Sequence, residues 1–418
     1  MDAETYVKQL ATAARAAAAE LALTRGAQRN DGLCSAAAAI RSAAADLQAA
    51  NEKDLARKDE FALTDAMVDR LTLTDKRIEG MATALEQIAA QDDPVGKTIS
   101  ATNRPNGLRV EKRRVPIGVV GIIFESRPNV TADVAGLCLK SGNACILRGG
   151  KEAMHSNQAI ATVVREALTA ADLPADAAIM IDRTDHDIVT AMARAEGLID
   201  LIIPRGGERL IRAVVEAATI PVIKHYAGNC HVYIHSAADL DMAESIVMNA
   251  KCQRPGVCNA AETLLVDAAV AEDFLPTICH KLTDAGVELR GCQRSRKLFK
   301  GMKAACEDDW RTEFLDLILA VKVVDSLSDA VTHINTFSSA HTEAIVTGDL
   351  AAADEFVARV DSSSVMVNAS TRFSDGGEYG LGAEVGISTD KLHARGPMGA
   401  EDLTTYKWIV TGRGHVRT

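Results

Sequence analysis

The sequence predicts an α/β protein with two parallel-sheet domains in tandem and a small β-hairpin element. Short apolar runs alternate with helix-length segments from residue 117 to residue 360, which is the pattern of a parallel sheet covered by helices. A second series of such runs starts after residue 228, so we expect a domain boundary there. Asn106-Gly107 stands between two extended-looking segments and is typical of a tight hairpin turn.

The first hundred residues are expected to be helical. Residues 11–21 and 36–47 are rich in alanine with scattered charges. Thr74 precedes Asp75 and a charged, periodic stretch, so we expect a helix to begin there with Thr74 as its N-cap. The segment Asp-Asp-Pro-Val-Gly at 92–96 breaks the helical pattern and leads to the hairpin, which we expect over 101–116.

The first series is expected to form a domain over 117–228 together with the N-terminal segment 1–100, and the second series a domain over 229–403. The first series has expected strands at 117–124, 144–147, 178–181, 199–203 and 222–223, and helices at 130–139, 157–169 and 208–218. The second has expected strands at 232–234, 263–266, 317–324, 344–346 and 365–367, and helices at 242–250, 270–285, 327–337 and 352–360. A last strand, 406–411, falls in a tail over 404–418.

Composition disfavours nucleic-acid-binding, membrane-spanning and secreted proteins. The 418 residues carry 46 Lys and Arg against 57 Asp and Glu, and a net charge of −11 disfavours nucleic acid as a partner. No stretch approaches the roughly 20 apolar residues of a membrane span, and the N-terminus does not resemble a signal peptide. The nine cysteines include no C-x-x-C pair, which fits free thiols in a reducing compartment. We therefore expect a soluble cytoplasmic protein.

Three loops after strands of the first series could hold an anion. Residues 124–129 lead into a helix whose first N–H groups are free. Arg148-Gly149-Gly150-Lys151 and Arg205-Gly206-Gly207 each combine an arginine with a glycine pair, so backbone and guanidinium can both reach a phosphate. Because the carboxyl ends of parallel strands share one edge, these loops predict a nucleotide or phosphate site. Glycine pairs that simply make turns remain the alternative.

The second series offers a candidate nucleophile and a candidate anion-binding loop. Cys258 follows Arg254 and Pro-Gly and precedes a strand, so it could be an activated thiolate, although a free cysteine is more commonly a small buried apolar residue. Its spacing from Cys252 fits no zinc motif, and the histidines at 225, 231 and 235 are expected to be structural, so we expect no metal. The polar segment 368–377 is either an anion site or an ordinary glycine-rich surface loop.

These segments, in this order, resemble the gamma-glutamyl phosphate reductase family within the aldehyde dehydrogenase superfamily. The resemblance runs from about residue 115 to 408 and is carried by stretches such as IIFESRPNV, LIIPRGG, KCQRPGVCNAAE and VNASTRFSDGGEYGLG. It implies an aldehyde-dehydrogenase-like fold: an NADP(H)-binding domain (1–100 and 117–228), a catalytic domain (229–403), and an oligomerisation element made of the hairpin and tail. Because a two-stranded ribbon is marginal alone, we expect at least a homodimer.

The resemblance also implies a reaction and its nucleophile. Cys258 aligns with the family's cysteine, which attacks L-glutamyl 5-phosphate, releases phosphate and forms a thioester. NADPH then reduces the thioester to L-glutamate 5-semialdehyde, the second step of proline biosynthesis from glutamate. The Cys258 N–H is a plausible oxyanion donor. Ser126 stands about where related enzymes carry an oxyanion asparagine.

Two departures from the superfamily pattern sharpen this expectation. Hydrolytic relatives carry a glutamate base in an E-L-G-G-K segment, whereas residues 225–229 here read His-Tyr-Ala-Gly-Asn. A base that activates water would hydrolyse the thioester, so its absence fits a reductase that releases phosphate. NAD-preferring relatives place an acidic residue where Lys151 stands, close to Arg148, so we expect NADPH over NADH.

The remaining expected site residues follow from the resemblance for the cofactor, and from position and charge alone for the substrate. For the cofactor they are Arg148, Gly149, Lys151, Arg205, Gly206, Gly207 and Glu313. For the glutamyl group or its phosphate they are Arg127, Arg254, Asn368, Ser370, Thr371 and Arg372. Since acyl phosphates are labile in water, we also expect transient association with a separate glutamate 5-kinase. Two alternatives stay open: a superfamily enzyme that oxidises an aldehyde to a free acid, and a binding or structural protein that keeps the fold without catalysis.

Overall fold

The computed structural model describes residues 1–417, and these divide into two units that we describe one at a time. Unit 1 consists of Met1–Lys224, Gly380–Gly386 and the residues from Met398 onward, and unit 2 of His225–Tyr379 and Ile387–Pro397. The predicted tail 404–418 ends on Thr418, which lies outside the described residues. Each unit contains a parallel sheet with helices on both faces, so the predicted α/β class is confirmed.

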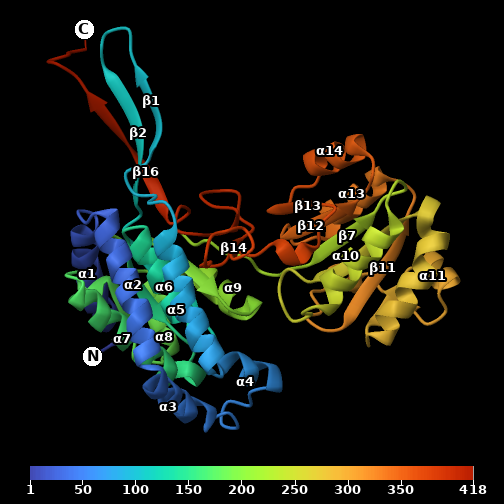
Figure 1. The fold of residues 1–418 in the computed structure, drawn as a ribbon, viewed down its shortest axis with the longest axis horizontal. Coiled ribbons are helices and arrows are strands. Elements are labelled where there is room, and N and C mark those ends of the chain that lie inside the picture. Colours follow the sequence, from blue (N-terminus) through green and yellow to red (C-terminus); the bar gives the residue numbers. More distant parts are fainter. Residues whose placement is uncertain (418) are drawn as a thin grey trace. The chain divides into compact units, whose positions relative to one another are not determined.

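Unit 1 begins with five helices (Figure 1), in agreement with the helical region expected from the sequence. They are α1 (Ala3–Leu21), α2 (Gly26–Ser42), α3 (Ala44–Leu55), α4 (Asp65–Leu71) and α5 (Asp75–Ala90). The Thr74 side chain accepts a hydrogen bond from the N–H of Arg77, which confirms it as the N-cap of α5. The alanine-rich stretch 36–47 is divided at Ala43 between α2 and α3.

The main sheet of unit 1 has the order β5-β4-β3-β6 and is parallel throughout. Its strands are β3 (Val119–Phe124), β4 (Ala144–Arg148), β5 (Ala178–Met180) and β6 (Leu201–Arg205), and its helices are α6 (Asn129–Lys140), α7 (Met154–Ala170), α8 (His186–Ala193) and α9 (Glu208–Ala217). The α8 helix was not predicted. The predicted strand at 222–223 makes a single bridge, from Val222 to Ile202. Because β3 is buried on both faces, it is apolar throughout rather than alternating.

The predicted hairpin forms a three-stranded antiparallel sheet with the C-terminal strand. Its order is β1 (Thr98–Asn103), β2 (Arg109–Pro116) and β16 (Thr404–Thr411), and Gly107 in the turn has a φ of 89°. Figure 1 shows this sheet extending away from the helices of unit 1. One face of β16 exposes Tyr406, Trp408 and Val410, which are 48%, 59% and 58% exposed, so this sheet leaves apolar side chains uncovered within the chain.

Unit 2 has a seven-stranded parallel sheet of order β10-β9-β11-β8-β7-β12-β13. The strands are β7 (Cys230–Ile234), β8 (Ala261–Asp267), β9 (Glu288–Gly291), β10 (Lys303–Ala304), β11 (Ile318–Val324), β12 (Thr342–Val346) and β13 (Ser364–Val367). The helices are α10 (Leu240–Cys252), α11 (Ala268–Asp284), α12 (Gln293–Leu298), α13 (Leu327–Phe337) and α14 (Leu350–Arg359). The sequence did not predict β9, β10 and α12. A short pair, β14 (Ile387–Ser388) and β15 (Gly396–Pro397), completes the unit.

The division of the chain differs from the predicted boundaries in two respects. Residues 225–228, expected in the first domain, belong to unit 2. Segment 380–386 and the residues from 398 to 403, expected in the second domain, belong to unit 1. Hydrogen bonds explain this. Arg205 binds the carbonyl oxygens of Glu384 and Val385, and the Asn143 side chain donates to the carbonyl of Leu403. The chain therefore passes between the units more than once.

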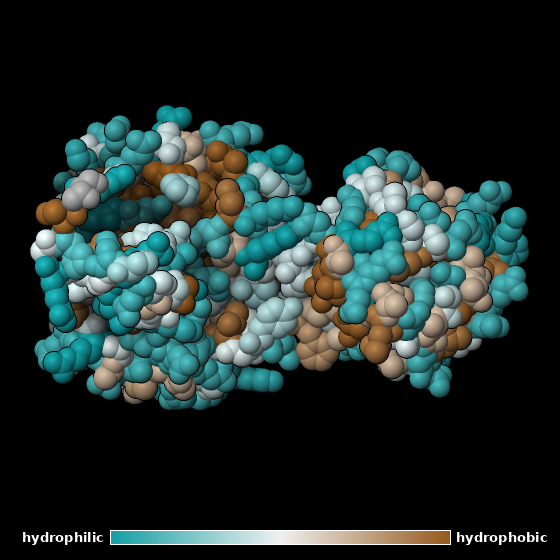
Figure 2. Space-filling model, turned by 90° about the horizontal axis from the view of Figure 1, so that it is seen from above, coloured by the Kyte–Doolittle hydropathy of each residue, from teal (hydrophilic) through white to brown (hydrophobic). Residues whose placement is uncertain are grey.

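Figure 2 shows a surface that is mostly hydrophilic on this face, with hydrophobic side chains gathered in separate patches. No helix among residues 1–417 has both the length and the apolar composition needed to span a bilayer.

Candidate functional site

Cys258 lies in the loop from α10 to β8 and is half-buried. The segment that enters β7 passes directly over this loop. A Cβ atom built on Gly228 would lie 1.9 Å from the carbonyl oxygen of Cys258, so only glycine allows the two backbones to come this close. The Cys230 thiol donates to the same carbonyl oxygen at 3.2 Å. Cys258 is thus held at the amino-terminal edge of the sheet of unit 2.

Two imidazole side chains lie close to the thiol of Cys258. A ring nitrogen of His225, a ring nitrogen of His341 and the Cys258 sulfur all lie within 4.8 Å of one another. The two rings stand edge to face with centroids 5.6 Å apart. The sequence did not indicate that His225 lies beside this thiol. His231, by contrast, is fully buried and paired with Glu343.

The strand order explains why sequence reasoning missed this cluster. His225, Cys258 and His341 precede β7, β8 and β12, which are neighbours in the order β8-β7-β12. Because parallel strands start at the same edge, the residues before them converge. The sequence predicted the strands, but the pairing of β7 with β12 joins segments more than a hundred residues apart. The separation of the histidines along the chain gave no signal of their proximity.

Two arginine side chains lie in the neighbourhood of the thiol. Arg372 donates from Nε to Gln253 Oε1 at 2.7 Å and from Nη1 to Asn259 Oδ1. Burial lowers the pKa of Arg372, the neighbouring Arg254 cation lowers it further, and the thiol group of Cys258 acts in the opposite direction. Arg372, Arg254 and Cys258 are therefore close enough to interact electrostatically, as the sequence predicted for a site that takes an anion.

The segment 368–372 is only partly directed at this site. Ser370 accepts a hydrogen bond from the N–H of Arg372, and Thr371 is fully buried, so both hold the turn that presents the arginine. Asn368 follows the carboxyl end of β13, with a φ of 54°, and its amide exchanges hydrogen bonds with the backbone of Thr347 after β12. Asn368 thus joins two strand ends at the edge opposite Cys258, and its predicted role in binding substrate is not supported.

A buried ion pair joins α10 to β8, the two elements that flank the loop of Cys258. Lys251 Nζ lies 2.6 Å from Glu262 Oε2, and both side chains are fully buried. Burial raises the pKa of Glu262 to about 7, and Lys251 acts in the opposite direction. Glu313, expected to hold a cofactor ribose, instead accepts the N–H of Gly228 at 2.8 Å. In the structure this carboxylate orients the segment that contacts Cys258.

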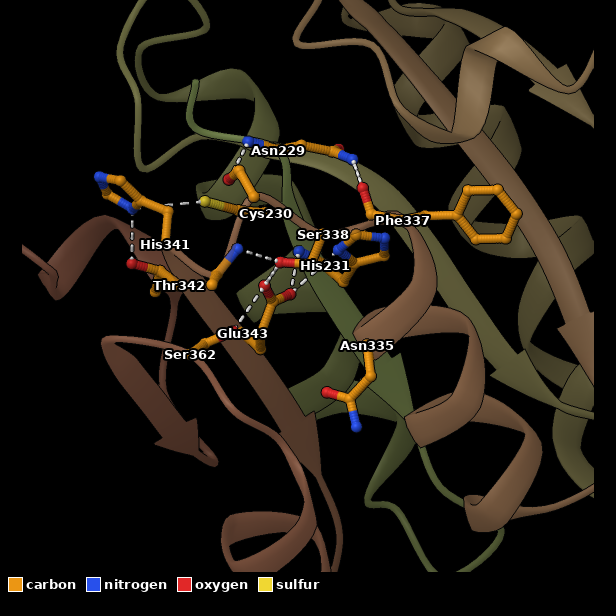
Figure 3. A network of polar contacts seen from close by, with 12 residues as sticks. Asn229, Cys230, His231, Asn335, Phe337, Ser338, His341, Thr342, Glu343 and Ser362 are labelled. Atoms are coloured by element: carbon orange, nitrogen blue, oxygen red, sulfur yellow. Dashed lines mark hydrogen bonds and ion pairs between the residues drawn. The ribbon is translucent and has the colours of Figure 1, made fainter. Parts of the chain in front are cut away.

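A second polar network supports the histidine side of the site (Figure 3). Glu343 Oε2 accepts from the backbone N–H of His231 at 2.8 Å and lies 3.0 Å from its Nδ1. The other carboxylate oxygen accepts from Ser338 and, at 3.2 Å, from Ser362. The Asn229 amide donates to the carbonyl oxygens of Trp310 and Phe337. These bonds tie the backbone that follows Gly228 to the segments before and after His341.

In unit 1, the three predicted loops meet at the carboxyl edge of the sheet, as expected. Ser126 has a φ of 36°, and its hydroxyl and N–H both donate to Glu152 Oε1, at 2.6 and 2.7 Å. Glu125 accepts from the N–H of Gly207 at 2.9 Å. The loops after β3, β4 and β6 are therefore joined by two carboxylates, those of Glu125 and Glu152, which the sequence did not indicate as site residues.

The basic residues after β4 differ in exposure. Arg148 is largely buried and donates from Nη2 to the carbonyl of Thr184 at 2.9 Å. Burial lowers its pKa, which Glu152 and other carboxylates partly offset. Lys151 is exposed, with its ammonium group 5.0 Å from the centre of the Phe61 ring. Arg127 follows Ser126 in the loop after β3 and is half-buried.

Arg205 binds a segment that is distant in the sequence. Its guanidinium binds the carbonyl oxygens of Glu384 and Val385 at 2.9 and 2.8 Å and Glu384 Oε1 at 3.1 Å. These bonds attach segment 380–386 to β6, so direct contact between Arg205 and a cofactor phosphate is not supported. The same region contains Asp133, whose pKa burial raises to about 6.

The carboxyl edge of unit 1 nevertheless fits a phosphate-bearing cofactor. Gly149, Gly206 and Gly207 leave the backbone at this edge uncovered by side chains. At Gly149 a side chain has no room, because its Cβ would lie 2.0 Å from Asn157 Nδ2. Exposed Lys151 supplies a cation at the same edge. Backbone N–H groups with a nearby ammonium are a common way to bind phosphate.

Comparisons with known proteins agree with this arrangement. The model of the aldehyde dehydrogenase family matches residues 1–290. The chain is 54% identical over 404 residues to gamma-glutamyl phosphate reductase of Moorella thermoacetica, with 97% of each chain covered. It is 52% identical over 416 residues to the protein of that name from Thermobifida fusca, with 100% of each covered. The crystal structure of gamma-glutamyl phosphate reductase from Thermotoga maritima matches with a TM-score of 0.95 at 45% identity, covering 98% of this chain and 99% of that one.

Proposed function

Because this chain belongs to the aldehyde dehydrogenase family, we propose that it reduces L-glutamyl 5-phosphate to L-glutamate 5-semialdehyde with NADPH and releases phosphate. The observation that carries this proposal is the setting of Cys258: a half-buried thiol with Arg372 and Arg254 close by, on a chain similar over its full length to reductases of that name. In proline biosynthesis from glutamate this would be the second step.

Cys258 is the proposed nucleophile. Its sulfur forms a bond to the acyl carbon as the bond from that carbon to the phosphate oxygen breaks, and phosphate leaves with the electron pair. The two guanidinium groups stabilise both the thiolate and the departing phosphate. The N–H of Cys258 is the proposed donor to the oxyanion. Because Gly228 and the Lys251–Glu262 pair fix the loop, the sulfur is presented without further rearrangement.

NADPH, when bound, supplies the hydride that reduces the thioester carbon. Lys151 is the proposed contact for its 2′-phosphate, and Gly149, Gly206 and Gly207 are the proposed backbone contacts. Arg148 contributes positive potential from beneath the loop, because its side chain is buried against Thr184. Arg127, Ser370 and Thr371 keep proposed roles beside the substrate, the last two by orienting Arg372.

The segment 225–229 supports a reductase over a hydrolytic dehydrogenase. Hydrolytic relatives carry a glutamate base there, and this chain has His225 beside Cys258. Ser126 is a weaker oxyanion donor than the sequence suggested, because its hydroxyl already donates to Glu152. The substrate oxygen therefore depends on the backbone N–H of Cys258.

The reverse reaction tests the proposal. The enzyme would receive L-glutamate 5-semialdehyde, NADP and phosphate, and formation of the reduced cofactor would be followed by absorbance. We expect activity that requires phosphate and is lost in Cys258→Ser, with Cys252→Ser as the matched control. Activity that is independent of phosphate would indicate a hydrolytic dehydrogenase, and activity retained in Cys258→Ser would reject the nucleophile.

We propose a homo-oligomer assembled through the β1-β2-β16 sheet. Tyr406 and Trp408 project from one face of β16, and the Lys112 ammonium lies 3.6 Å from the centre of the Tyr406 ring. An exposed aromatic row on a small sheet with two open edges needs a partner to be buried. Trp408→Asp should yield a smaller species by light scattering. An unchanged mass would argue against this interface.

We also propose a cytoplasmic location and transient association with a separate glutamate 5-kinase. All nine cysteines are free, which suits a reducing compartment. Association would shorten the lifetime of the acyl phosphate in water. A gain in coupled rate on mixing the two enzymes, above that of a non-binding kinase control, is the expected result, and no gain would contradict the association.

A further inference from the structure

The cluster beside Gly228 has the composition of a metal site. Among the described residues, His225, Cys258 and His341 are the group of potential ligands whose donor atoms lie within 4.8 Å of one another. One sulfur and two imidazole nitrogens are ligands that zinc and related cations prefer. The proposed reaction uses the sulfur and assigns no role to the two imidazoles.

The donor atoms are separated by no more than 4.8 Å, which can be compared with the spacing of ligands around a bound ion. Bonds from zinc are about 2.3 Å to sulfur and about 2.0 to 2.1 Å to nitrogen. In a tetrahedral site these lengths place the donor atoms roughly 3.3 to 3.6 Å apart. Side-chain rotations that move each donor by about an ångström would therefore complete three ligands around one ion and leave a fourth position for water.

The surroundings orient one of the imidazoles. His341 is fully buried, and its Nδ1 lies 2.9 Å from Thr342 Oγ1 and 3.8 Å from Cys230 Sγ. Figure 3 shows the other ring nitrogen pointing away from the remaining labelled residues. Ligating histidines commonly have one nitrogen hydrogen-bonded so that the opposite one faces the metal. We assign Nε2 of His341 to the ion.

We propose that Cys258, His225 and His341 bind a soft divalent cation, with Zn²⁺ as the reference ion, and that binding blocks the nucleophile. The Cys258 sulfur forms a coordinate bond to the ion, and the thiol proton leaves to solvent, without any redox change. The inhibition of the reaction by the ion rests on the proposed role of Cys258 as nucleophile, whereas binding of the ion does not. Nearby Arg372 and Arg254 oppose a cation and limit its affinity, so the site is suited to reversible inhibition rather than to a permanent cofactor.

Direct binding is tested with cobalt, which reports thiolate ligation and tetrahedral geometry by absorption. The reduced, chelator-treated full-length protein is titrated with Co²⁺ and then with Zn²⁺ as competitor. We expect one ion per chain with a thiolate charge-transfer band, which Zn²⁺ removes. The band should be absent in Cys258→Ser, and binding should weaken at least tenfold in His225→Asn and in His341→Asn.

Controls separate this site from adventitious binding and from misfolding. Cys252→Ser and Cys306→Ser remove other accessible thiols and should bind as the wild type does. His225 is only half-buried, so His225→Asn keeps the test valid if the buried His341→Asn fails to fold. No tetrahedral spectrum at saturating Co²⁺, or unchanged binding in Cys258→Ser or His225→Asn, would overturn the proposal.

A rate measurement distinguishes the two proposals. Zn²⁺ should inhibit the reverse reaction at the concentrations that occupy the site, and a chelator should restore the rate. Binding at Cys258 without inhibition would overturn the blocking claim and the role of Cys258 as nucleophile, while the metal site would stand. Inhibition that persists in His225→Asn at unchanged Zn²⁺ concentration would place the inhibitory ion elsewhere and overturn this assignment.

Discussion

Gly228 and Cys258 are in direct backbone contact, and a side chain on Gly228 would overlap the carbonyl group of Cys258. The Gly228 N–H is also held by Glu313. The nucleophile's position thus depends on a residue thirty positions earlier in the chain.

Gly228→Ala should displace the Cys258 loop. The added Cβ meets backbone atoms that cannot rotate away, so we expect kcat to fall at least a hundredfold and stability to fall by about 2 kcal/mol. Steady-state kinetics and thermal unfolding would measure both effects. Gly80→Ala is the control: it lies inside α5 with no atom within 4 Å of a new Cβ, and it should be slightly stabilising. Full activity in Gly228→Ala would contradict the proposed close contact.

Arg372→Lys should weaken substrate binding although it keeps the charge. Arg372 uses Nε and Nη1 to reach Gln253 and Asn259, a forked geometry that lysine cannot reproduce. We expect kcat/KM for the acyl phosphate to fall about a hundredfold, mainly through KM. Arg254→Lys, at an exposed position, should lose less than tenfold. Equal effects of the two substitutions would show that only total charge matters.

Lys151→Glu should change the cofactor preference. The exposed ammonium at the carboxyl edge of β4 is the proposed contact for the 2′-phosphate, and a carboxylate there repels that group. The ratio of kcat/KM for NADPH to that for NADH should fall at least tenfold. Lys76→Glu makes the same change of charge on an exposed turn of α5 and should leave the ratio unaltered. An unchanged ratio in Lys151→Glu would exclude this residue from discrimination.

His333 should make unit 2 sensitive to acid. Burial, together with the neighbouring His231 and Lys322, lowers its pKa to about 2, so the folded protein holds a neutral imidazole. The unfolded chain takes up a proton near pH 6.5, so stability is complete above that pH and is lost as pH falls below it. The slope contributed by this residue is up to about 1.4 kcal/mol per pH unit.

Urea unfolding at pH 7, 6 and 5 would measure this effect. His333→Phe places a neutral ring among Trp310 and Phe337 and should flatten the loss of stability below pH 6.5. His235→Phe is a useful control, because His235 is half-buried beside Thr347. The same slope in His333→Phe and the wild type would show that other groups cause the acid sensitivity.

Much of the fold could be predicted because it depends on local pattern. Periodicity and capping placed α5 at Thr74, and the Asn106-Gly107 dipeptide placed the hairpin. The unpredicted elements were short or weakly patterned: β9 has four residues, β10 two and α12 six. The two strands depend on pairing rather than on their own composition, since β9 pairs with β11 and β10 pairs with β9.

The candidate site was harder to predict because its geometry is set by strand order. The sequence singled out Cys258, Arg372 and the loops of unit 1, because a thiol, a guanidinium group and glycine pairs each indicate a particular kind of chemistry. It did not indicate that Arg205 and Asn368 bind the backbone of neighbouring segments, because polar side chains after strands can bind either a ligand or the protein itself. It could not pair Lys251 with Glu262, or His225 with His341, because only the tertiary fold brings these side chains together.

The central claim is that phosphate, not water, releases the acyl group from Cys258. The most direct test mixes the enzyme rapidly with L-glutamate 5-semialdehyde and NADP in the absence of phosphate, and follows the reduced cofactor. We predict a burst of one equivalent per active chain that then slows sharply, that turns into steady turnover when phosphate is added, and that is absent in Cys258→Ser. Steady turnover without phosphate, or a burst that survives in Cys258→Ser, would contradict the account.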